Sequence, residues 1–123
     1  MHIRPALIAL LSLFLVGIVQ AADSDIRLNS LAGKIDEDWD WGNVRNLGMF
    51  TYVLSRREGR DPNLLEQVRR DTIAVADSLV AKAQQDVYGR PLAGRYCWGC
   101  NGTIARQVLN LHVANRLSAN PAY

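Results

Sequence analysis

Cysteine is scarce in this sequence, and its two copies, Cys97 and Cys100, stand close together. A thioredoxin-like cysteine pair follows a strand in an α/β pattern, and no alternating apolar run here is long enough to predict a strand. Haem attachment requires a histidine after the second cysteine, where Asn101 stands. Zinc requires four ligands, and the only histidine after residue 22 is His112. We therefore expect no cofactor and no metal, and a thiol oxidoreductase remains only an alternative.

A strong charge of one sign is also missing. Fourteen Lys and Arg against twelve Asp and Glu give a formal net charge of +2, and the two signs alternate along the chain. No nucleic-acid partner is therefore implied. The 123 residues, 49% of them hydrophobic, correspond to one small domain or part of a larger one, with a thin core.

Residues 1–22 have the pattern of an export signal. Arg4 supplies the positive start, Ala6 to Val19 form the apolar run, and Val19-Gln20-Ala21 offers small residues for cleavage. An uncleaved anchor is the alternative, although a spanning helix needs roughly 20 apolar residues. We expect residues 23–123 to form the mature domain, secreted or periplasmic, without membrane attachment after cleavage and in an oxidising compartment.

Apolar residues recur at helical spacing in three later segments. They predict helices over Val44–Arg57, Asn63–Gln85 and Thr103–Leu117. Asp61 is the predicted N-cap of the second helix, with Pro62 at its first position. Gly59 is expected to stop the first helix. The predicted fold class is therefore all-α, built from helical hairpins.

The apolar residues also predict which helix faces are buried. The apolar residues of the first helix are Val44, Leu47, Phe50, Val53 and Leu54. The second helix has Leu65, Val68, Thr72, Val75, Leu79 and Ala83 on one face, and the third carries Ile104, Val108, Leu111 and Leu117. Three helices alone would leave Ile73, Val80 and Leu109 without partners. Exposed apolar patches of this kind favour self-association.

Two long stretches resemble a known enzyme family. They are "WGNVRNLGMFTYVLSRREGRDPNLLEQVRRDTIAVADSLVAKA" and "YGRPLAGRYCWGCNGTIARQVLNLHVANRLSANPAY". Both are similar to glycoside hydrolase family 9, the secreted cellulases and related β-glucanases built as a barrel of six helical hairpins. The resemblance runs from Asp38 to Tyr123, and "YCWGCNG" matches the family's Tyr-x-Trp-Gly-Ser-Asn-Gly most specifically. It implies part of an (α/α)6 barrel, incomplete in this chain.

The same resemblance implies that this chain lacks the family's catalytic groups. Inverting glycosidases need a base and an acid roughly 6.5 to 9.5 Å apart. The family's Asp-Ala-Gly-Asp base motif and its acid Glu have no counterpart in this sequence. We therefore expect a truncated or rearranged glycosidase, inactive alone and without catalytic residues of its own. The alternative is a non-catalytic exported helical module that binds glycan or protein.

Four acids precede the first predicted helix: Asp36, Glu37, Asp38 and Asp40. A pair of them could perform general acid/base catalysis if their pKa values were separated. A solvated acidic cluster, favoured near a helix N-terminus by the helix dipole, is the preferred interpretation.

Aromatic residues are the preferred ligand-binding candidates. Trp41 and Trp98 offer flat indole faces that can stack on the C–H face of a sugar. The resemblance places Trp98 at a glucose subsite and Trp41 at the cleft, so a β-glucan or cello-oligosaccharide is the implied partner. Packing between hairpins is the alternative for both. Asn101 either caps the third helix or binds a sugar hydroxyl. Trp39 and Tyr96 are expected to be structural, with the Tyr96 hydroxyl as a further candidate for contact in the cleft.

The cysteine pair departs from the family pattern, because Cys100 stands where the family has Ser. A short disulfide between Cys97 and Cys100 that stiffens the Trp98 loop is the preferred interpretation. Two buried thiols are the alternative.

Overall fold

The chain was analysed as a computed structural model that describes residues 35–40, 42–92 and 98–123. Its helices are α2 (Arg45–Leu54), α3 (Pro62–Ala83) and α4 (Cys100–Ser118), and the described residues contain no strand. The predicted all-α class is confirmed. All three predicted helices are present, although α2 ends before the predicted Arg57 and α4 begins before the predicted Thr103.

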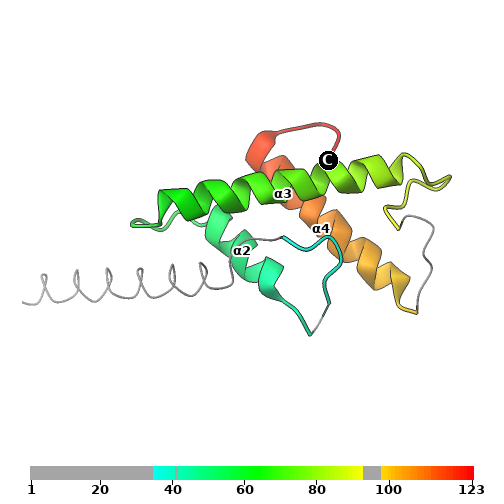
Figure 1. Cartoon of the computed structure of the whole chain (residues 1–123), viewed down its shortest axis with the longest axis horizontal. Helices are drawn as coiled ribbons and strands as arrows, with labels where there is room; N and C mark the ends of the chain where they lie inside the picture. Colours follow the sequence, from blue (N-terminus) through cyan, green and yellow to red (C-terminus); the bar gives the residue numbers. More distant parts are fainter. Residues whose placement is uncertain (1–34, 41, 93–97) are drawn as a thin grey trace, which may run out of the picture.

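The long helix α3 runs across the view in Figure 1, α2 lies below it, and α4 crosses it, with its start below and its end above α3. Both α2 and α4 contact α3. Residues 35–40 contact all three helices. Asp36 bonds to Asn46 of α2, Glu37 to Lys82 of α3, and Trp39 to Asn110 of α4. This non-helical segment therefore bonds to α2, α3 and α4 together.

An arginine side chain determines where α2 ends. Ser55 is extended, and the guanidinium of Arg60 donates to the carbonyl oxygens of Tyr52 and Val53 at 3.2 and 3.4 Å. A cation at a helix C-terminus satisfies free carbonyls and interacts favourably with the helix dipole. Gly59, with φ of 74°, lies in the turn after the helix rather than at its last residue.

The start of α3 agrees with the prediction. The Asp61 side chain accepts hydrogen bonds from the backbone N–H groups of Asn63 (2.8 Å) and Leu64 (3.4 Å), and Pro62 occupies the first helical position. This cap satisfies two N–H groups that the helix itself cannot pair.

Both ends of α4 have left-handed backbone. Gly99 precedes it with φ of 82°, and Ala119 follows it with φ of 51°. At the C-terminal end the Arg69 guanidinium of α3 donates to the Leu117 carbonyl oxygen at 2.8 Å. Thus α3 caps the helix that packs against it.

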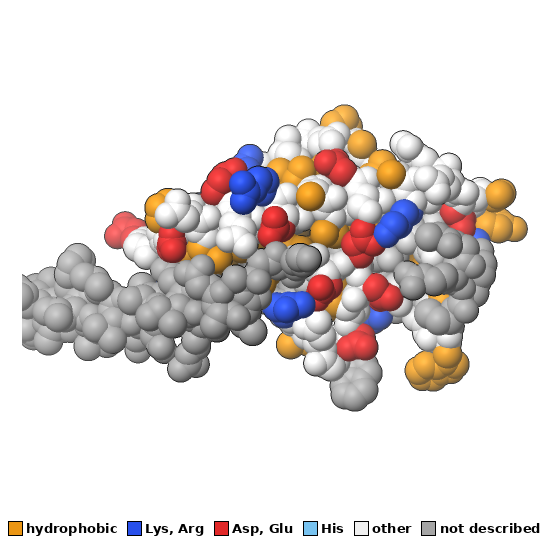
Figure 2. Space-filling model, viewed as in Figure 1, with side chains coloured by type: hydrophobic (Ala, Val, Ile, Leu, Met, Phe, Trp, Pro, Cys, Tyr) orange, Lys and Arg blue, Asp and Glu red, His pale blue; other side chains and the backbone are white. Residues whose placement is uncertain are grey.

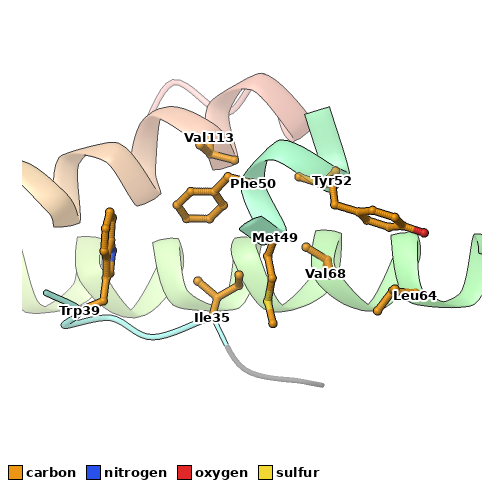
Figure 3. Packing of buried hydrophobic residues seen from close by; sticks show 9 residues of the cluster. Ile35, Trp39, Met49, Phe50, Tyr52, Leu64, Val68 and Val113 are labelled. Atoms are coloured by element: carbon orange, nitrogen blue, oxygen red, sulfur yellow. The ribbon is translucent and has the colours of Figure 1, made fainter. Parts of the chain in front are cut away.

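The core lies between the three helices and residues 35–40 (Figure 3). Its buried members are Ile35, Trp39, Met49, Phe50, Tyr52, Val53, Leu64, Val68 and Val113. Full burial of one such aliphatic or aromatic side chain is worth about 1.5–3 kcal/mol. On α3 the predicted Val68, Thr72 and Leu79 are buried, whereas Leu65 and Val75 are only partly buried at the edge of the cluster.

The predicted buried face of α4 is only partly confirmed: Leu117 packs against the core cluster, and Ile104 and Leu111 are half-buried. Its buried residues are Thr103, Gln107, Asn110, Val113 and Ala114. Val108 is 53% exposed, whereas Leu109 packs against the core cluster instead of lacking a partner. The physical reason is that the buried polar side chains of α4 find hydrogen-bond partners inside the protein, so this helix does not follow the hydrophobic pattern.

Candidate functional site

Two of the four acids bond to partners on different helices. The Asp36 carboxylate forms a 2.6 Å ion pair with Arg45 and accepts a 3.0 Å hydrogen bond from Asn43. The Glu37 carboxylate forms an ion pair with Lys82 and accepts a 2.5 Å hydrogen bond from the Ser78 hydroxyl. These two carboxylates therefore hold residues 35–40 against α2 and α3.

The other two acids are exposed, as the solvated-cluster interpretation predicted. Asp38 lies at the surface. Asp40 accepts hydrogen bonds from the backbone N–H groups of Gly42 (2.8 Å) and Asn43 (3.2 Å), which stabilises the turn before α2. The solvated-cluster interpretation is wrong for Asp36 and Glu37, because their carboxylates form ion pairs with Arg45 and Lys82.

A buried polar cluster lies behind these acids. The Asn46 amide accepts from the Asp36 backbone N–H at 3.0 Å and donates to the Asp36 carbonyl at 2.8 Å. Asn110 donates to that same carbonyl at 3.2 Å and accepts from the Trp39 indole N–H at 3.2 Å. Asn46 and Asn110 are completely buried, and Trp39 is 6% exposed. Trp39 is therefore a packed residue, as expected.

Trp98 and Gly99 form the turn that enters α4. The Trp98 side chain is fully exposed. Gly99 is the residue at the N-cap position, and its carbonyl accepts from the Gly102 N–H at 2.8 Å. Asn101 lies exposed within the first turn, so the alternative in which it caps the helix is wrong, whereas hydroxyl binding stays a prediction.

Several predicted site residues lie outside the described residues: Trp41, Tyr96 and Cys97. The proposed Cys97–Cys100 disulfide therefore stays a prediction, and the described Cys100 is half-buried at the start of α4.

Pro91, in the loop after α3, is bonded to α4. The Gln107 side-chain amide donates to the Pro91 carbonyl at 3.3 Å, and Gln107 is 4% exposed. Its Oε1 has no hydrogen-bond partner among the described residues. The sequence analysis did not predict that Gln107 and Asn110 are buried. The available signal was helical spacing, because Thr103, Gln107, Asn110 and Ala114 recur at steps of four, three and four.

The loop after α3 has its own polar centre, Asp86. Its carboxylate accepts from the Tyr88 backbone N–H at 2.8 Å and from the Arg90 guanidinium at 3.2 Å. The Tyr88 hydrogen bond, assisted by those from Arg90, lowers the pKa of Asp86 below its ordinary value of 3.8. The Arg90 guanidinium lies 4.5 Å from the centre of the Tyr88 ring. This ordered turn was also missed from the sequence.

Over the described parts of the chain, no three His, Cys, Asp or Glu side chains are grouped as metal ligands. In the same parts, no helix has the length and apolar character needed to cross a membrane. His112 is exposed on α4.

The fold and surface define an all-α segment with an exposed tryptophan at a helix start. Similarity to known proteins is more specific. Over 101 residues, the chain is 46% identical to each of two sequences of Endoglucanase D of Acetivibrio thermocellus, one of which comes from a named strain. The similarity supports a relationship to the cellulases. No protein-family model matches the chain.

The matched region covers 82% of this chain and 16% of the endoglucanase. The chain therefore spans less than a fifth of the length of the curated relatives it matches.

Proposed function

We propose that this chain is a glucan-binding segment of a cellulase-type catalytic domain of glycoside hydrolase family 9. The observation that carries the proposal is the fully exposed Trp98, in a chain that is 46% identical to an endoglucanase. An indole in water presents a flat apolar face that a β-1,4-glucan can cover with its C–H groups. Gly99, with its positive φ, directs the chain sharply into α4 beside this ring.

Binding by this segment requires no catalytic carboxylate. In an inverting glycosidase, one carboxylate activates water and the other group protonates the leaving oxygen. Here Asp36 and Glu37 pair with Arg45 and Lys82, and Asp40 stabilises a turn. We propose that the catalytic pair of the whole domain lies elsewhere, and that this chain alone binds glucan without hydrolysing it.

Isothermal titration calorimetry with cellohexaose tests the binding. Trp98→Ala should weaken binding about tenfold. Val108→Ala is the control: it truncates another exposed apolar side chain of α4 but removes no flat ring, so binding should be unchanged. Absence of binding by the wild-type chain would reject the glucan proposal. It would leave the alternative, a non-catalytic exported helical module that binds another glycan or a protein.

A reducing-sugar assay on soluble β-glucan tests the catalytic part. We expect no release of sugar by the purified chain. If sugar is released, and Asp38→Asn with Asp40→Asn abolishes the release, the exposed acids are catalytic and the proposed division of roles is wrong.

Export to a secreted or periplasmic location belongs to the same proposal. It rests on the apolar run from Ala6 to Val19 and on the small residues at Val19-Gln20-Ala21. Intact-mass measurement of the exported protein should show cleavage after Ala21 or Ala22. Retention of the full-length chain in the cytoplasm would contradict it.

A further inference from the structure

Hydrophobic side chains project from the molecule at the loop after α3 and at the start of α4, at the same end in Figure 2. The residues responsible in the loop are Val87 and Tyr88, 96% and 78% exposed. Charged side chains of both signs are interspersed over the rest of this face (Figure 2). Single exposed apolar side chains are common on protein surfaces. Tyr88 differs from them because its neighbours contact both its ring and its backbone.

The Tyr88 ring is fixed in position by its neighbours. The backbone N–H of Tyr88 donates to Asp86, which also pairs with the Arg90 guanidinium. That guanidinium covers one face of the Tyr88 ring, 4.5 Å from its centre. The ion pair orients Arg90, and the cation–π contact, which is weak at an exposed site, favours one orientation of the Tyr88 ring.

A ring held in this way suits a ligand that stacks. Because the conformation is set before binding, little side-chain entropy is lost when a partner covers the ring. One face is occupied by Arg90, so a single flat partner fits on the other face. The phenol hydroxyl adds a donor and acceptor at the edge of the ring.

We propose that Tyr88 is a second glucan-stacking position, separate from Trp98 and held in place by Asp86 and Arg90. The inference rests on the proposed glucan binding, because the ligand class is taken from it. Tyr88 contacts one glucose unit through its open face, and Arg90 acts only as a positioning residue on the opposite face. A chain with two stacking positions binds longer oligosaccharides more tightly than short ones.

The experiment is calorimetric titration of the whole chain with cellotriose and cellohexaose. Tyr88→Ala should weaken cellohexaose binding about three- to tenfold. Tyr88→Phe, which keeps the flat ring, should stay within about twofold of the wild type. Val87→Ala is the matched control, since it truncates the exposed neighbour without touching the ring, and it should have no effect.

Arg90→Gln separates positioning from direct contact. It removes the guanidinium from the ring and should weaken cellohexaose binding less than Tyr88→Ala does. In the double variant Tyr88→Ala with Arg90→Gln, the arginine substitution should have no further effect. If Arg90→Gln weakens binding equally with and without Tyr88, arginine acts on the ligand directly and the positioning role is wrong.

The outcomes separate this inference from the glucan proposal. If the wild-type chain binds neither oligosaccharide, both are rejected. If Trp98→Ala weakens binding and Tyr88→Ala leaves it unchanged, only the second position is rejected. Amide chemical shifts measured during titration of the wild type give an answer independent of variant folding: Tyr88 and Gly89 should shift with cellohexaose, and unchanged shifts there would overturn the inference.

Discussion

The indole N–H of Trp39 donates a hydrogen bond to the side-chain oxygen of Asn110 at 3.2 Å, across 71 positions of sequence. The same Asn110 donates to the Asp36 carbonyl, so one buried amide joins the segment before α2 to the middle of α4. Buried polar groups contribute to stability when they are paired and are costly when a partner is removed. We therefore expect the stability of the fold to depend on Asn110.

Asn110→Ala should lower the free energy of unfolding by about 2–4 kcal/mol, because it leaves the Trp39 indole N–H buried without its partner and opens a small cavity. Urea denaturation followed by far-ultraviolet circular dichroism measures the change. Asn115→Ala is the matched control: this asparagine is exposed on the same helix, and its substitution should cost less than about 0.5 kcal/mol. Equal effects of the two substitutions would contradict the role of the buried cluster.

Ala119→Gly should stabilise the protein. Ala119 follows α4 with φ of 51°, a left-handed conformation that is unfavourable for residues with a Cβ and accessible to glycine. The expected gain is about 0.5–1 kcal/mol, seen as a higher melting temperature. Ala105→Gly, at an exposed position inside the same helix, should instead destabilise by a similar amount. A loss of stability from Ala119→Gly would refute the argument.

The loop after α3 should lose stability in acid. The pKa of Asp86 is lowered in the folded protein, chiefly by the hydrogen bond from the Tyr88 N–H, so its contribution is present above pH 3.8 and disappears as the pH falls through the folded value. Carboxyl carbon chemical shifts should place the Asp86 midpoint below 3.8. The wild type should be more stable than Asp86→Asn at pH 7, and this difference should vanish at the lowest pH values. A pH-independent difference would be inconsistent with the linkage.

Tyr123 should titrate above its ordinary value. Its hydroxyl donates a 2.5 Å hydrogen bond to Asp77 of α3, and this bond raises the pKa of Tyr123 above 10.0. The contribution to stability is therefore present below pH 10 and lost as the pH rises through the folded value. Ultraviolet titration of tyrosine ionisation should show a late group that moves to lower pH in Asp77→Asn. An unchanged titration curve in that variant would rule out the contact.

Self-association should depend on the outer face of α2. Leu47 and Leu54 are 43% and 45% exposed, and their spacing of seven places them on one side of α2. Val44, directly before this helix, is 54% exposed. Sedimentation velocity at rising concentration should show association that Leu47→Lys with Leu54→Lys reduces. Val87→Lys, in the loop after α3, serves as the control and should not reduce association. Monomeric behaviour of the wild type at all concentrations would disprove this expectation.

The sequence predicted α3 well because its signals are local. Asp61 and Pro62 define the start, and Val68, Thr72 and Leu79 repeat on one face over several turns. Trp98 is exposed, so it is not packed among the described residues, and its role in binding stays a prediction.

The face of α4 could not be predicted in this way, because hydrophobicity does not determine it. Gln107 and Asn110 point inward since Pro91 and Trp39 provide their partners, and the Trp39 partner is distant in sequence. The Tyr88 turn was missed for a different reason: its order comes from side chain to backbone bonds at Asp86, which leave no hydrophobic period.

Two contacts on α4 determine how this helix can move. Asn110 bonds to the Asp36 carbonyl, and about two turns further along the Leu117 carbonyl accepts from Arg69 of α3. Sliding α4 along its axis by one turn, about 5.4 Å, would break both bonds at once, and rotating it would withdraw Asn110 from its partners. We therefore expect α4 to keep its register against α3 and the segment before α2. The positive φ of Gly99, ahead of α4, makes this glycine the expected place for any change in the direction of Trp98.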